Sequence, residues 1–129
     1  SDLWLFVVGV LIQVFLAGLV VVSRVSNWDD HIGLGHGLAL PLILMLIFMY
    51  VGRMPRPIKP VTWMLFGVYV FQADFVIFLR DSVPYAAALH PVMALIDFAL
   101  GWRLARLGLA ITTGGEPVVA MTAAPSAAE

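Results

Sequence analysis

The stretch Leu3–Val22, LWLFVVGVLIQVFLAGLVVV, decides the fold of this chain. A helix rises about 1.5 Å per residue, so roughly 20 apolar residues cross the hydrocarbon core of a bilayer, which is about 30 Å thick. Three further apolar stretches of similar length follow, at Ile32–Val51, Val61–Leu79 and Tyr85–Leu104. This pattern predicts an all-α protein: an up-down-up-down bundle of four transmembrane helices.

The composition agrees with a membrane protein. The 129 residues are 62% hydrophobic and 12% charged, and the mean hydropathy is +1.01, so lipid must solvate much of the surface. No cysteine is present, which excludes disulfides, iron–sulfur ligation and thiolate zinc sites. A net charge of −1 argues against a nucleic-acid partner. The sequence has no hydrolase motif, so we expect no enzyme activity beyond electron transfer.

Basic residues near the ends of the stretches predict the orientation of the bundle. Arg24 and Arg80 on one side are offset by nearby acidic residues. The other side carries more positive charge, and the positive-inside rule places it in the cytoplasm, together with both termini. The basic residues of that side are Arg53, Arg56, Lys59, Arg103 and Arg106.

Two regions are expected along the chain. Residues 1–108 form the transmembrane bundle, and residues 109–129 form an irregular cytoplasmic tail rich in Ala, Pro and Gly. Alone, a tail of this composition does not fold. We expect it to be ordered only against a neighbouring protein, which points to a larger assembly.

The second stretch begins with features that weaken and bend a helix. Glycines at positions 33, 35 and 37 each destabilise a helix by roughly 1 kcal/mol relative to alanine, but they let a flat ligand approach closely. Pro41 is expected to kink this helix. Asp29 or Asp30 is expected to cap its N-terminus.

His36 and His90 are the strongest functional candidates. His36 lies four residues inside the second stretch and His90 five residues inside the fourth, so both lie at nearly the same depth. Ionisable groups within a membrane are costly and point to a functional site. The second and fourth helices of such a bundle lie on a diagonal. The two imidazoles are therefore expected to ligate the iron of one b-type haem.

Small residues at matching depth would make room for the haem, and Asp74 would accept a hydrogen bond from one liganding histidine. The expected haem-binding residues, besides the two histidines, are Ala17, Gly18, Gly33, Gly37, Ala73 and Asp74.

Other interpretations use the same residues. Asp74 could pair directly with His36 or His90 in a polar network that fixes helix order without any cofactor. Asp97 and Gln13 are expected near mid-bilayer, where they could bond to each other. His31 is expected to be a solvated loop residue. The aromatic residues of the third stretch suit lipid contact, or the packing of a pigment or quinone.

Three motifs together resemble a known family: Gln13–Gly18 (QVFLAG), Trp28–His36 (WDDHIGLGH) and Leu89–Leu95 (LHPVMAL). They resemble small bacterial four-helix membrane proteins catalogued as domain of unknown function 6220, over roughly Leu3–Gly108. The resemblance implies a four-helix fold in a bacterial plasma membrane and implies no activity.

Taken together, these features predict a small integral-membrane subunit of a larger bacterial complex, respiratory or photosynthetic, with one b-type haem between His36 and His90. The alternative is a non-redox structural or assembly subunit with a His–Asp network. Other integral membrane subunits and lipids are the expected partners.

Overall fold

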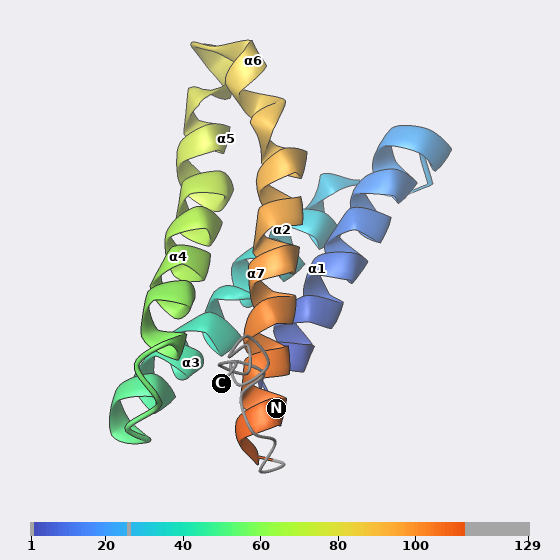
Figure 1. Ribbon diagram of the computed structural model, residues 1–129. Coiled ribbons are helices and arrows are strands. Elements are labelled where there is room, and N and C mark those ends of the chain that lie inside the picture. The colour runs from blue at the N-terminus through green and yellow to red at the C-terminus, as the bar shows by residue number, and fades with distance from the viewer. Residues whose placement is uncertain (1, 26, 113–129) are drawn as a thin grey trace, which may run out of the picture.

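In the computed structural model, the described residues, 2–25 and 27–112, are helical and contain no strand. They form four rods, each built from consecutive helical segments (Figure 1). The first rod is α1 (Asp2–Gly18) with the π-helical η1 (Leu19–Ser23), and the second is α2 (Trp28–Gly37) with α3 (Ala39–Val51). The third joins α4 (Ile58–Val70), the π-helical η2 (Phe71–Phe75), α5 (Val76–Phe78) and η3 (Leu79–Asp81), and the fourth joins α6 (Pro84–Ala87) to α7 (Leu89–Thr112).

Two of the interruptions have the same cause. Leu38 separates α2 from α3, three residues before Pro41, and Ala88 separates α6 from α7, three residues before Pro91. Proline has no N–H to bond the carbonyl four residues earlier, and its ring presses against that carbonyl. The kink expected at Pro41 is therefore confirmed.

The rods pack in a ring. α7 contacts both α1 and α4, and α3 contacts the same two helices. The second and fourth rods therefore lie on a diagonal, as expected. Side chains spaced three or four residues apart on each rod fill the centre, and the most buried of them are Phe6, Leu42, Leu65 and Leu104.

The cap of the second rod differs from the prediction. Asn27 is the N-cap, and its side-chain Oδ1 accepts a hydrogen bond from the N–H of Asp29 at 3.0 Å. Asp29 and Asp30 lie in the first turn instead, where the helix dipole favours negative charge. The N-cap lies earlier in the sequence than predicted because the helix already begins at Trp28, before the apolar stretch starts.

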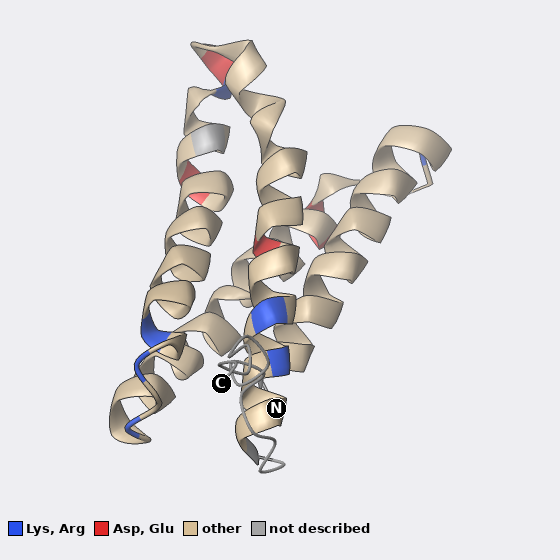
Figure 2. Cartoon of the chain, viewed as in Figure 1, with Lys and Arg blue, Asp and Glu red and all other residues tan. Residues whose placement is uncertain are grey.

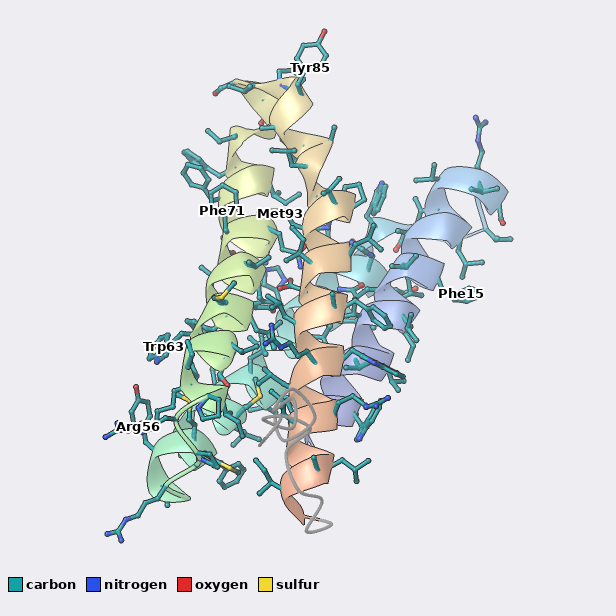
Figure 3. All side chains as sticks on the ribbon, in the orientation of Figure 1. Phe15, Arg56, Trp63, Phe71, Tyr85 and Met93 are labelled. Carbon is teal, nitrogen blue, oxygen red and sulfur yellow. The ribbon has the colours of Figure 1, made fainter. Side chains whose placement is uncertain are left out.

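Two helical segments, Leu3–Ser23 and Trp28–Val51, are long and apolar enough to cross a membrane. Many of their side chains point outward, as the labelled Phe15 does in Figure 3. The side chain of Phe15 is 63% exposed. The other two rods are less apolar because the third carries Asp74 and Arg80, and α7 carries Asp97 and two arginines. The four-helix membrane span is therefore not established for the third and fourth rods.

Basic residues gather at one end of the described fold (Figure 2). This end holds the start of α1, the connection from α3 to α4 and the last turns of α7. At the end of the bundle, α7 continues past Gly108 to Thr112. The rest of the predicted tail, residues 113–129, lies outside the described residues.

Candidate functional site

His31 and His90 meet across the diagonal of the bundle. Their ring centroids are 5.9 Å apart, and the two ring planes make an angle of 68°. His31 is part of α2, and His90 lies in the first turn of α7. Both side chains are partly buried. The prediction that His31 is a solvated loop residue is therefore wrong, because the second helix begins before it and turns its ring inward.

Each of these rings is held by a backbone carbonyl of another rod. Nδ1 of His31 lies 3.0 Å from the carbonyl oxygen of Gln13 in α1, and Nδ1 of His90 lies 3.1 Å from that of Gln72 in η2. A carbonyl only accepts, so each Nδ1 carries the proton and donates it. Nε2 of each ring is then left with its lone pair, which is the arrangement found in metal-binding histidines.

A second polar contact lies beside this pair. Asp97 of α7 is fully buried, and its Oδ2 accepts a hydrogen bond from the side-chain Nε2 of Gln72 at 2.5 Å. The expected partner of Asp97 was Gln13, but the Gln13 amide lies against Gly35 instead. Gln72 faces the bundle because it lies on the same side of the third rod as the buried Tyr69.

The Tyr69 hydroxyl is inserted at the break between α2 and α3. It donates a hydrogen bond to the carbonyl of Gly35 at 2.5 Å, and the backbone N–H of Ala39 bonds to the same hydroxyl. In an unbroken helix these two backbone groups would bond to each other. The hydroxyl thus satisfies both, and a side chain inserted in this way stabilises a helix kink.

His36 lies on the other side of α2. It is five positions from His31, which corresponds to a rotation of about 140° around the helix axis. Its side chain is exposed, and its Nδ1 lies 2.9 Å from the carbonyl oxygen of Ile32 in the preceding turn. The described contacts of His90 are with His31 and Gln72. The pairing of His36 with His90 therefore stays a prediction, and the geometry favours His31.

The remaining predicted site residues do not gather in one place. His36, Ala73 and Asp74 line one open groove on the surface. A Cβ added to Gly18, Gly33 or Gly37 would meet no atom within 4 Å, so these glycines border open space and not a packed wall. Ala17 is half-buried on α1. The alternative prediction paired Asp74 with His36 or His90. The observed bonds differ: His90 bonds to a backbone carbonyl, as His31 does, and the carboxylate of Asp97 bonds to Gln72 of another rod.

Part of the chain matches a known protein family. Residues 13–76 match the model of a family of unknown function, DUF6220. The chain contains a DUF6220 domain. No curated protein and no solved structure matches the chain.

The DUF6220 match begins at Gln13 and includes His31, His36, Tyr69 and Gln72. Two of the three motifs that carried the resemblance, Gln13–Gly18 and Trp28–His36, lie within it. His90 and Asp97 lie beyond its end. The family therefore covers one histidine of the pair and the carbonyls that hold both rings.

One signal in the DUF6220 sequence points to His31. The buried Leu38 and Leu42 lie on the inward side of the second rod. Counting back from them in steps of three and four residues gives Gly35 and His31, and not His36. Depth alone does not distinguish the two histidines, but the spacing of the apolar residues does.

Proposed function

We propose that this protein binds one b-type haem through His31 and His90 and serves as an electron-transferring subunit of a larger membrane complex in the bacterial plasma membrane. One observation carries this proposal: two imidazoles from diagonal rods lie with ring centroids 5.9 Å apart, and in each the Nδ1–H donates to a backbone carbonyl and leaves Nε2 as an acceptor. A bound haem would supply one-electron chemistry.

The spacing of the two rings suits a shared metal. A metal–imidazole nitrogen bond is about 2 Å long, and a ring atom lies roughly 1 Å from the ring centre, so two imidazoles on opposite sides of one ion have centroids about 6 Å apart. The observed separation is 5.9 Å. Iron places no restriction on the angle between the two rings, so the observed 68° is acceptable.

The protein's residues have separate tasks in this proposal. The carbonyls of Gln13 and Gln72 fix the tautomer and direction of each ring, and such outer partners raise the basicity of a liganding histidine. Trp28 packs edge-on against His31, with ring centroids 5.5 Å apart, and covers its outer side. The Gln72–Asp97 bond holds η2 against α7 next to His90.

The membrane location is supported by two helices long and apolar enough to cross a bilayer. In the proposed arrangement all four rods cross, and both termini are cytoplasmic. The basic end of the fold, with Arg53 and Arg56 in the connection after α3 and Arg103 and Arg106 in α7, would then face the cytoplasm.

A second candidate is a non-redox structural subunit. It is favoured by two hydrogen bonds between rods, Gln72–Asp97 and Tyr69–Gly35, which tie the bundle together without a cofactor. In that case the His31–His90 contact would only fix the packing of α2 against α7.

A reduced-minus-oxidised absorbance spectrum of the purified protein tests the choice. We expect a low-spin b-type spectrum that His31→Ala and His90→Ala abolish. His36→Ala is the matched control, since it removes an exposed imidazole of the same helix and is expected to leave the spectrum intact. Absence of a Soret band in the wild-type protein supports the structural subunit. Loss of the spectrum in His36→Ala, with retention in His31→Ala, supports the His36–His90 pair.

A further inference from the structure

An open groove of about 970 Å³ lies on the outward side of η2 and α5. His36 of α2 lines it on one side, and its other walls come from the third rod. Gly33, one turn before His36, and Gly37, directly after it, border open space, so this side of α2 lacks bulky neighbours. The groove is distinct from the His31–His90 pair, which lies on the inward side of α2.

The groove combines a flat apolar wall with two hydrogen-bond acceptors. Phe71 and Phe75 form the wall, with ring centroids 5.0 Å apart and an angle of 36° between the rings. Nδ1 of His36 donates to the Ile32 carbonyl, which leaves its Nε2 as an acceptor. Asp74 contributes a carboxylate, whose oxygens only accept when ionised.

If the rods cross a membrane, the acceptor groups of His36 and Asp74 need a hydrogen-bond donor. His36 lies in a segment apolar enough to span a bilayer, and an exposed imidazole or carboxylate facing hydrocarbon is costly and points to a functional site. Acyl chains offer no hydrogen-bond donor. A ligand that satisfies both groups must carry two hydroxyls on a body flat enough to lie against Phe71 and Phe75.

We propose that this groove binds a hydroquinone, with one hydroxyl donating to His36 and the other to Asp74. The proposal rests on the membrane location proposed above, but not on the haem. The ring would stack on the Phe71–Phe75 wall, and the isoprenoid tail would lie along the lipid-facing surface, since the groove is open to that side. At its outer end the groove reaches Arg80 and Asp81, an exposed ion pair with an N–O distance of 3.5 Å.

The test uses the full chain in phosphatidylcholine nanodiscs, under anaerobic conditions, titrated with decylubiquinol while tryptophan fluorescence is recorded. We expect saturable binding that is about 10-fold or more weaker in His36→Leu and in Asp74→Asn, because a hydrogen bond to a charged or buried group contributes about 1.5–3 kcal/mol. Asp29→Asn, an exposed carboxylate at the start of α2, is the matched control and should bind like the wild type.

Decylubiquinone is the second probe. It lacks the hydroxyl donors, so we expect it to bind at least about 10-fold more weakly than the quinol, as sites built to bond a hydroxyl reject analogues without it. Equal affinity for quinol and quinone, or unchanged affinity in both variants, overturns the proposal and indicates that lipid or a partner subunit covers the groove. Circular dichroism confirms that each variant is folded.

The fluorescence readout does not depend on haem. Absence of saturable quinol binding in the wild-type protein therefore counts against the groove, whereas a missing Soret band counts against the His31–His90 site. The two proposals can fail separately.

Discussion

At the scale of single residues, the Tyr69 hydroxyl links the third rod to the break in the second. It bonds to Gly35 and Ala39, the two backbone groups that the break would otherwise leave without partners. Its ring also packs edge-on against Phe6 of α1, with centroids 6.3 Å apart. One side chain therefore fixes the kink and ties three rods together.

We expect Tyr69→Phe to lower the free energy of unfolding by about 1–3 kcal/mol, because it keeps the ring and leaves a partly buried carbonyl and N–H without their partner. Unfolding in mixed micelles of dodecyl sulfate and dodecyl maltoside measures this. Tyr50→Phe is the control: Tyr50 is 56% exposed and only accepts a bond from Trp63, so its loss should matter by less than about 0.5 kcal/mol. Equal effects of both variants would contradict the role of Tyr69.

The sequence predicted which residue types matter here but not always which way they face. The positions of His36 and His90 along their helices follow from the apolar stretches, whereas the direction of His36 depends on a rotation about the helix axis. An error in this rotation assigns the site to His36 in place of His31, which lies five residues earlier on the same helix. The Gln72–Asp97 bond was not predicted, because the rotation of η2 relative to α7 follows from packing between rods.

At the scale of elements, the contact between α1 and α7 depends on a small residue. A Cβ added to Gly101 would lie 3.1 Å from Cδ1 of Phe6 and 3.3 Å from Cγ2 of Val7. Close approach through small residues is the usual mode of helix packing in membranes. Asp97 and Gly101 lie four residues apart on α7, on the same side of the helix, and both are buried.

Gly101→Leu should therefore destabilise the bundle by about 1–3 kcal/mol, as overpacking of a tight contact does. Gly67→Leu serves as the comparison, because Gly67 of α4 is exposed and a Cβ there meets no atom within 4 Å. Thermal unfolding followed by circular dichroism in dodecyl maltoside distinguishes the two. A Gly101→Leu protein as stable as Gly67→Leu would show that α1 and α7 do not pack through this glycine.

Some element-level features are predictable and others are not. The break before Pro41 follows from local chemistry and was expected, and the break before Pro91 has the same cause. The π-helical segments η1 and η2 have no comparable local signal. In η2, Gln72 is buried and Asp74 is exposed, as expected for residues two positions apart on a helix.

At the scale of the whole molecule, the distribution of charge sets the orientation that we propose. Alkaline phosphatase, which is active only outside the cytoplasm, should be inactive when fused after Glu129 and active when fused after Ser82, in the turn between the third and fourth rods. The reason is the cluster of basic residues at the end that holds the start of α1 and the last turns of α7. The opposite pattern of activity would show that the bundle has the reverse orientation. The groove proposed to bind quinol would then lie toward the cytoplasmic side.

The packing of α7 against α1 has a consequence for biosynthesis. The ribosome synthesises α1 and α4 before α7, so the faces of α1 and α4 that α7 covers stay without this partner until α7 has been made. The same order applies to the imidazoles, because His31 emerges long before His90. A nascent chain that stops before Leu89 has a single histidine of the pair, so insertion of the proposed haem would follow translation of the fourth rod.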